Sequence, residues 1–271
     1  MTDLLHTIIA WPLSVNVAIV FLLSASVPLL SVWLIRRIWP YPTFKENNEL
    51  IGFTYAVYGL IYGVLLAFTI IIGWEGFQST EQLVMDEATV LSELWRDSEP
   101  FPPAMRADIH NDLTAYTQSV IDDEWPTMAE QGMASPKTQA IYEHLWTLSY
   151  EIKPENEIQR AYLGEFLGRM HELSGDRRLR IMHSTEEVPS VLLLVLLIGG
   201  VPTVAYTLLF SNKHAWVQMV IMGNIMLIVL LGLLVTLSLQ HPFSGGVSIE
   251  PEAFRQLLDS FHLRALAPAP A

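Results

Sequence analysis

The sequence predicts an all-α, polytopic membrane protein with four transmembrane helices and an inserted helical bundle whose outer helices extend from spans two and three. Two observations lead to this prediction. Four stretches of 25 residues or more contain no charged side chain, although the chain carries a formal charge of −13. All of the excess negative charge lies in one polar segment between the second and third stretches.

Each uncharged stretch is long enough to cross a bilayer, because a hydrocarbon core of about 30 Å requires roughly 20 apolar residues in a helix. The spans are placed at about 10–35, 51–74, 188–210 and 215–239. The first span is not a cleaved signal peptide, since it is too long and its basic pair Arg36–Arg37 follows the apolar run.

These boundaries divide the chain into four parts. Residues 1–74 hold the first two spans and a short basic loop, 75–187 form an acidic soluble helical stalk domain, 188–240 hold the last two spans, and 241–271 form a tail. The stalk domain has 22 acidic and nine basic residues, whereas the rest of the chain has six of each. The charge of −13 is therefore the charge of the insert.

Helix signals organise the insert. Apolar residues spaced by three or four continue one helix face from the second span to Trp95, and the prolines at 100–103 end that helix. A second helix is predicted to stop at Trp125–Pro126, and Ser135–Pro136 begins a third. Pro154 opens the last helix, which is predicted to run on into the third span. Four antiparallel helices fit this pattern.

Loop charges predict the topology. Arg36, Arg37 and Lys45 lie between spans one and two, and Lys213 lies between spans three and four. Lys and Arg in short loops mark the cytoplasmic side. The insert, residues 75–187, and both termini are therefore expected outside the cytoplasm.

One ion pair is predicted from helix length. Glu81 lies about seven residues outside Trp74, and Arg180 about eight residues before Val188. At 1.5 Å per residue, both lie roughly 10–12 Å from the membrane edge. We expect Glu81 to pair with Arg180, or with Arg177, across the two stalk helices; the alternative is two separately solvated charges.

The second span has a small-residue face and a hydroxyl face. Gly59, Gly63 and Ala67 recur every four residues, which favours close helix packing. On the other face, hydroxyl groups at membrane depth need partners or water. The candidates for lining a pore or polar cavity on that face are Thr54, Tyr58, Tyr62 and Thr69.

Asn224 is a further candidate in the fourth span. It lies about ten residues in, near the middle of the bilayer. A single amide at that depth most often hydrogen-bonds to a neighbouring helix, and pore lining is the alternative.

Several functional classes are excluded or disfavoured. The chain has no cysteine, so thiolate metal sites and thiol nucleophiles are absent. No hydrolase, zinc-protease, P-loop or dinucleotide motif is present, and we predict no catalytic, cofactor or metal site and no enzyme. The spans contain no central ionisable residue, which argues against proton-driven transport and voltage sensing. The acidic charge disfavours nucleic acid as a partner.

Motifs distributed over residues 40–260 resemble the bacterial bestrophin-like membrane family. They are Asn48, Gly52, Tyr58–Gly59, Tyr62–Phe68, Trp74, Glu87–Ala88, Tyr116, Val120–Ile121, Glu124–Pro126, Arg177–Arg180 and Pro242–Gly245. The resemblance implies a multi-pass protein of the bacterial inner (plasma) membrane. Bestrophins are pentameric anion channels, so it also implies an oligomeric, channel-like protein.

Two hypotheses follow. The first is a homo-oligomeric ion channel in the lipid bilayer with its pore between subunits, because four spans enclose a wide aqueous path poorly. An acidic domain at a pore mouth concentrates cations, so no ion is assigned. The second is a non-conducting envelope sensor or scaffold that acts through a partner protein.

Overall fold

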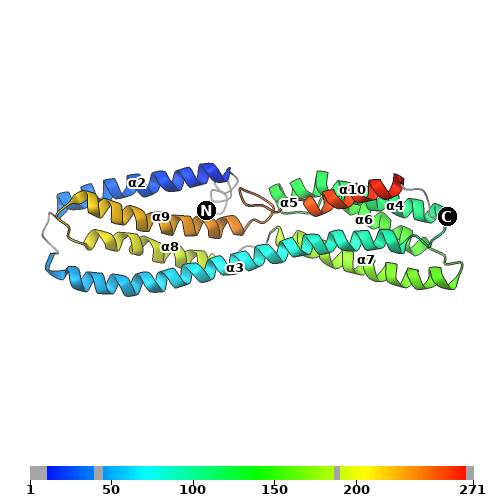
Figure 1. The fold of residues 1–271 in the computed structure, drawn as a ribbon, viewed down its shortest axis with the longest axis horizontal. Coiled ribbons are helices and arrows are strands. Elements are labelled where there is room, and N and C mark those ends of the chain that lie inside the picture. The colour runs from blue at the N-terminus through cyan, green and yellow to red at the C-terminus, as the bar shows by residue number, and fades with distance from the viewer. Residues whose placement is uncertain (1–10, 40–44, 186–189, 267–271) are drawn as a thin grey trace. The chain divides into compact units, whose positions relative to one another are not determined.

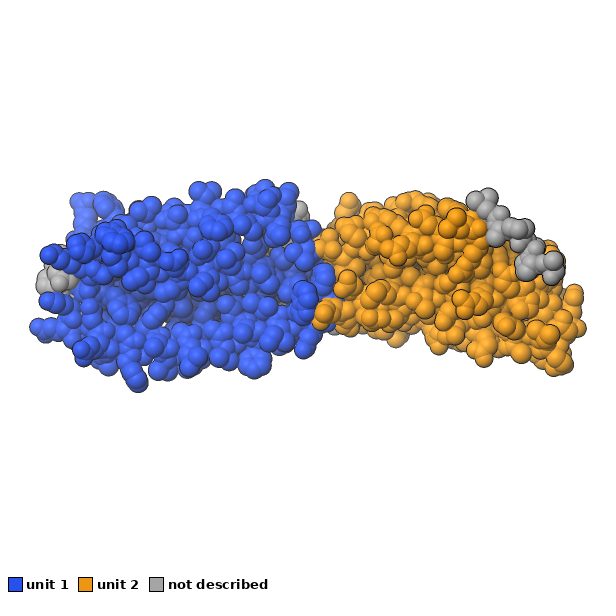
Figure 2. Space-filling model, in the orientation of Figure 1, with its two compact units in different colours: residues 1–77, 187–241, 245–247 blue, residues 78–186, 242–244, 248–271 orange. Residues whose placement is uncertain are grey.

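The computed structural model describes residues 11–39, 45–185 and 190–266, and all regular elements in these ranges are helices (Figure 1). The chain forms two compact units, coloured separately in Figure 2. One, the membrane unit, comprises residues 1–77, 187–241 and 245–247; the other, the insert unit, comprises 78–186, 242–244 and 248–271. The predicted boundary at 187/188, the N-terminal residues with Asp3, and the last five residues lie outside the described ranges.

The membrane unit contains the four predicted spans. They are α2 (Leu13–Ile38), the first part of α3 (Asn48–Asp97), α8 (Ser190–Ala205) and α9 (Ala215–Leu239). Short 3₁₀ turns, η1 (Lys45–Asn47) and η3 (Tyr206–Leu209), precede α3 and follow α8. All four helical segments are long and apolar enough to cross a membrane, which confirms the prediction of four spans.

Glycines let the membrane helices approach one another. A Cβ atom on Gly223 of α9 would lie 2.9 Å from the carbonyl oxygen of Ser24 in α2, and the two helices lie side by side in Figure 1. A Cβ atom on Gly232 would lie 2.6 Å from the Leu66 side chain of α3. Because real Cβ atoms do not approach a backbone oxygen so closely, Gly223 requires glycine, whereas a side chain at Gly232 would have to displace that of Leu66.

The insert unit is built from the remainder of α3 and six further helical elements. They are α4 (Pro103–Ser119), the π-helical turn η2 (Val120–Glu124), α5 (Trp125–Gln131), α6 (Pro136–Glu151), α7 (Glu157–His183) and α10 (Glu252–Leu266). Side chains cap two of them: Ser135 accepts a hydrogen bond from the Thr138 N–H, and Asn156 accepts one from the Gln159 N–H. Such caps satisfy amide groups that a helix N-terminus leaves free.

The helix expected to stop at Trp125–Pro126 continues through these residues to Gln131. The reason is the π turn η2, in which the N–H of Trp125 bonds to the carbonyl of Val120, five residues back. Proline lacks an N–H and clashes with the carbonyl four residues earlier in a regular helix. The wider turn absorbs this conflict immediately before Pro126.

The last insert helix, α7, ends at His183 and does not run into the third span as predicted. Ser184 and Thr185 form a turn, and their hydroxyls bond back to the carbonyls of Ile181 and Met182. These local bonds compete with helix continuation. Helix α8 then begins separately at Ser190.

The tail, treated in the sequence as a separate part, contributes α10 to the insert unit. Figure 1 shows α10 beside α4, and α10 contacts both α4 and the π turn η2. Phe254 and Phe261 of α10 are fully buried, and Phe261 stacks on Trp95 of α3 with ring centroids 4.4 Å apart. The core of the insert therefore includes residues that are distant in sequence from 75–187.

Candidate functional site

Four charged residues meet at the centre of the insert unit and form what we call the ionic cluster. Its members are Glu87 of α3, Glu124 of η2, and Arg177 and Arg180 of α7. All four are buried. Two carboxylates and two guanidinium groups give no net charge, which is the arrangement that a low-dielectric interior requires.

Arg180 is at the middle of the cluster. Its Nε donates to Oε2 of Glu87 at 2.6 Å, and its Nη2 donates to Oε1 of Glu87 at 3.0 Å and to Oε1 of Glu124 at 2.8 Å. The side chains of all three residues are fully buried. One guanidinium thus joins α3, α7 and η2 through charge-assisted hydrogen bonds, the strong class of such bonds.

Arg177 completes the pairing. Its Nη2 donates to Oε2 of Glu124 at 2.7 Å, and its Nη1 donates to Oε1 of Gln139 on α6 at 2.6 Å. The backbone N–H of Ser135 also donates to Oε2 of Glu124, at 3.3 Å. The start of α6 is therefore fixed to the same cluster.

Tyr116 brings α4 into the cluster. Its hydroxyl donates to Oε1 of Glu87 at 2.7 Å. Burial raises the pKa of the Tyr116 hydroxyl well above its usual value, and the Glu87 carboxylate raises it further. The phenol therefore stays protonated and remains a donor to Glu87.

Aromatic rings enclose Arg180. Trp125 and Phe254 each place a ring 5.6 Å from its guanidinium carbon, within range of a cation–π interaction. Burial opposes the charged form of Arg180, but Glu87 and Glu124 outweigh it and the net effect raises the pKa of Arg180. The arginine is therefore permanently charged in this apolar enclosure.

The ionic cluster cross-links helices through hydrogen bonds and ion pairs. All four carboxylate oxygens of Glu87 and Glu124 accept hydrogen bonds from protein groups. No group of three side chains that could ligate a metal ion occurs in the described residues. The cluster holds α3, α4, η2, α6 and α7 in one arrangement.

The predicted stalk pair is corrected by this geometry. Glu81 is exposed, and Arg180 pairs with Glu87, six residues further along α3. The prediction used only the distance of each residue along the helix axis, and this distance does not determine the direction in which a side chain points. The sequence spacing indicates that Glu87 is buried, because it lies three residues after Val84 and four before Leu91 on the buried face of the helix.

Tyr62 and Thr69, two residues of the hydroxyl face of the second span, point into their own membrane unit. Tyr62 is 5% exposed and Thr69 is 4% exposed. Tyr62 packs with Leu66, Leu196 and Val229 in one buried cluster. The placement of Tyr62 and Thr69 inside a single chain does not fit the expected lining of a path between subunits.

Two hydroxyl residues nearer the start of α3 lie differently. The Tyr58 hydroxyl donates to the carbonyl of Gly199 on α8 at 3.3 Å, and its ring stacks on Tyr206. Thr54 is exposed, and its hydroxyl bonds back to the Leu50 carbonyl one turn earlier. Of the four hydroxyl candidates, Thr54 is the one that faces away from its own chain.

The small-residue stripe is open. Gly63 and Ala67 are exposed, and no described atom lies within 4 Å of a Cβ atom built on Gly59 or Gly63, beyond the helix itself. Packing within the chain uses glycines on the opposing helices instead, where Gly199 and Gly200 receive the ring of Tyr62. The stripe therefore does not pack against another helix in the described part of this chain.

Asn224 also faces outward. It is the tenth residue of α9, it is exposed, and no described group hydrogen-bonds to its side chain. Its neighbours on the same face, Val220, Ile221 and Ile228, are exposed apolar residues. A single amide thus interrupts an otherwise apolar surface at the depth of the bilayer centre.

Comparison with known proteins gives a consistent result. A family model for the bestrophin-like domain matches residues 22–254. A crystal structure of a variant of a bacterial bestrophin homolog from Klebsiella pneumoniae is similar, with a TM-score of 0.67, 14% identity, and coverage of 93% of this chain and 100% of that chain. A variant of a protein described as a membrane protein gives a TM-score of 0.68, 14% identity, and coverage of 94% and 99%. Comparison with curated proteins gives no match.

Proposed function

The chain belongs to the bestrophin-like family, and on that basis we propose that it forms a homo-oligomeric ion channel with its pore between subunits. The bestrophin fold is known for ion channels. In the membrane unit, α3, α8 and α9 pack around a buried cluster of Tyr62, Leu66, Leu196 and Val229. A cluster of this kind fills the space between the helices of one chain, so an aqueous path has to run between chains.

Asn224 is the observation that carries this proposal. An amide without a partner in hydrocarbon costs several kcal/mol. Asn224 is exposed at the middle of α9 among apolar neighbours, and within the described chain nothing satisfies it. A second subunit or a water-filled path would supply the missing hydrogen bonds.

The open stripe of α3 gives independent support. Gly59, Gly63 and Ala67 leave the helix backbone accessible, and such stripes allow two membrane helices to approach closely. A second copy of the chain is the occupant that a homo-oligomer provides. Thr54 and Asn224 are then the polar candidates for contact with the path.

For topology we propose the arrangement that the loop charges favour. Arg36, Arg37 and Lys213 lie on the cytoplasmic side of the inner membrane, and the acidic insert lies on the other side. Arg36 links the end of α2 to the start of α9, because its guanidinium donates hydrogen bonds to the Gln218 side chain and to the Asn212 carbonyl.

Particle images of the purified full-length protein in detergent test the assembly. We expect a symmetric ring with a central path, and a smaller assembly for Asn224→Leu than for the control Ile228→Leu, which changes an apolar neighbour on the same face. A monomer or a tightly packed dimer for the unmodified protein would contradict the proposal.

A sensor or scaffold is the second candidate, and the continuity of α3 favours it. This single helix, Asn48–Asp97, carries Tyr62 of the membrane unit and Glu87 of the ionic cluster. A change of helix position in one unit therefore has a direct covalent route to the other. Electrical silence, together with one partner protein cross-linked in native membranes, would favour this function over a channel.

A further inference from the structure

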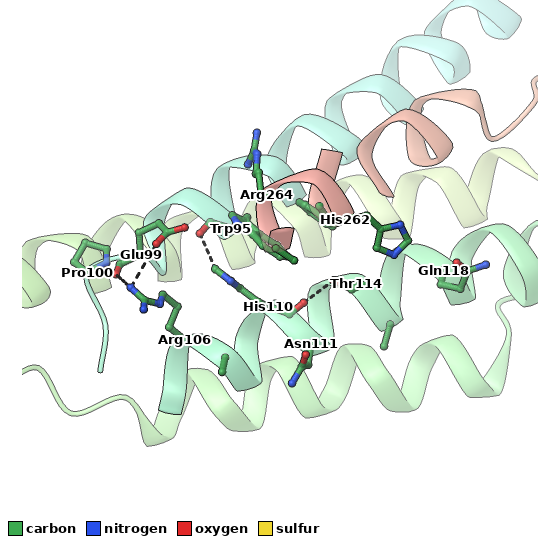
Figure 3. A pocket seen from close by; sticks show the side chains of 14 residues that line it. Trp95, Glu99, Pro100, Arg106, His110, Asn111, Thr114, Gln118, His262 and Arg264 are labelled. Atoms are coloured by element: carbon green, nitrogen blue, oxygen red, sulfur yellow. Dashed lines mark hydrogen bonds and ion pairs between the residues drawn. The ribbon is translucent and has the colours of Figure 1, made fainter. Parts of the chain in front are cut away.

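A cavity of about 1280 Å³ opens between α4 and α10, beside the end of α3 in the insert unit (Figure 3). Small-molecule pockets usually measure about 300–1,000 Å³, so this cavity has room for an organic molecule and accompanying water. It shares no lining residue with the ionic cluster. The structural role of the ionic cluster therefore does not explain this cavity.

One wall of the cavity is a stack of three rings. His110 lies on one face of Trp95, with centroids 3.6 Å apart and an interplanar angle of 12°, and Phe261 lies against Trp95 at 4.4 Å and 17°. Trp95 is 4% exposed and Phe261 is fully buried. Trp95 and Phe261 are therefore closed to solvent, and the half-buried His110 is the ring of the stack that a ligand in the cavity can contact.

His110 is fixed within this wall. Its Nε2 lies 3.0 Å from the Ser98 hydroxyl and 3.3 Å from the Trp95 carbonyl oxygen. Polar groups of α4 that include Asn111 and Thr114 also line the cavity, and Figure 3 shows them on the same helix as His110. The cavity thus combines the ring of His110 with hydrogen-bonding groups, as ligand sites generally combine apolar and polar surfaces.

The charges that line the cavity are mainly positive, although the insert as a whole is acidic. Arg106 pairs with Glu99 at 3.5 Å, whereas Arg264 is exposed and has no carboxylate partner among the described residues. Arg264 makes one long hydrogen bond, 3.3 Å, to the Ser92 hydroxyl. Burial lowers the pKa of His110, the hydrogen bond to the Trp95 backbone and the charge of Glu99 raise it, and the charges of Arg106 and Arg264 lower it. Arg264 is therefore the lining cation with which a ligand carboxylate can pair.

We propose that this cavity binds a small organic anion with a flat apolar body, of the aromatic carboxylate class. The ring of the ligand lies against the ring of His110, which Trp95 and Phe261 hold in place by stacking, and its carboxylate pairs with the guanidinium of Arg264. Aromatic pairs favour offset or edge contacts with centroids 4.5–7 Å apart, and arginine matches carboxylate geometry with two parallel donors. A cationic ligand would instead meet two arginines, with the one lining carboxylate already occupied by Arg106.

The binding test uses the full-length protein in detergent, with 2-naphthoate as the probe and 2-naphthamide as the neutral analogue. Calorimetric titrations are referenced to protein-free micelles. We expect saturable binding of naphthoate, at least tenfold weaker binding of naphthamide, and at least tenfold weaker binding of naphthoate to Arg264→Gln. Arg255→Gln is the matched control, because Arg255 lies on the same helix, is exposed, and does not line the cavity.

Three outcomes overturn the proposal. They are the absence of saturable binding to the unmodified protein, equal affinity for the acid and the amide, and equal loss of affinity in Arg264→Gln and Arg255→Gln. Arg264 is exposed and makes no buried contact, so its replacement leaves the fold intact. The measured quantity is binding, so the result is independent of whether the protein conducts ions.

Discussion

Arg180 of α7 holds Glu87 of α3 through two hydrogen bonds, of 2.6 and 3.0 Å, with both side chains fully removed from solvent. Glu87 belongs to the same continuous helix as the buried Tyr62 of the membrane unit. The helix that crosses the membrane is therefore anchored in the insert by a buried ion pair. The second carboxylate on Arg180, from Glu124, extends this anchor to the π turn.

Glu87→Gln is predicted to destabilise the insert strongly. The substitution leaves Arg180 buried with one carboxylate instead of two, and breaking a buried pair costs about 3–5 kcal/mol. Thermal unfolding in detergent, followed by near-UV circular dichroism, measures the loss. The control is Glu81→Gln on the same helix, whose exposed side chain has no described ion pair. Equal unfolding temperatures for the two variants would contradict the assigned pairing.

Asp176 is predicted to make stability depend on pH. Burial raises the pKa of this carboxyl from 3.8 to about 6, and Glu87, Asp86 and Glu172 add to the shift. The folded chain holds the proton more tightly than the unfolded chain, so stability from this group is present below about pH 4 and is lost as the pH rises through 6.

Asp176→Asn removes this loss because the amide does not ionise. We expect the variant to unfold at a higher temperature than the unmodified protein at pH 7.5, and the difference to shrink at pH 4.5. Asp108→Asn, an exposed carboxyl on α4, is the control. A difference between Asp176→Asn and the unmodified protein that stays constant with pH would show that Asp176 is not the titrating group.

Phe261→Ala is predicted to show that the tail belongs to the insert. The side chain is fully buried against Trp95, and removing a buried phenylalanine costs about 3–5 kcal/mol. Leu263→Ala, two residues away on α10, serves as control because Leu263 is 70% exposed. Chemical denaturation followed by tryptophan fluorescence compares them. Similar midpoints would mean that α10 does not pack on the insert in solution.

Gly223→Ala and Gly63→Ala separate the two kinds of glycine in the membrane unit. Both changes gain helix propensity equally, but a Cβ atom at Gly223 would lie 2.9 Å from the backbone oxygen of Ser24, whereas Gly63 has open space. We expect Gly223→Ala to be less stable by about 1–3 kcal/mol, the usual cost of overpacking. Thermal stability in detergent provides the comparison, and a Gly63→Ala variant that is the less stable of the two would refute the packing.

The four spans were predictable because their signal is composition alone. An uncharged run of 25 residues or more needs no knowledge of neighbours, and each predicted span coincides with a helix. The π turn before Pro126 was not predictable in the same way, since a proline normally ends a helix. Its wider geometry places Glu124 in contact with Arg180, a relation between elements that are distant in sequence.

The packing of the tail and the burial of Glu87 could also have been predicted from the sequence. Phe254, Leu257 and Phe261 recur at helical spacing in the tail and are all buried, and Glu87 lies on the apolar face of α3. The directions of Tyr62 and Thr69 were harder to predict, because a hydroxyl face in a membrane helix suits a pore and a packed interior equally well. Only the packing against α8 and α9 distinguishes these alternatives.

The central claim is ion conduction by an assembly of this chain, and electrical recording from the protein reconstituted in planar bilayers tests it most directly. We expect discrete currents in the unmodified protein and altered conductance in Asn224→Leu, with Ile228→Leu unchanged. Absence of current across several salts, at both signs of the voltage and with correctly assembled protein, would contradict the account.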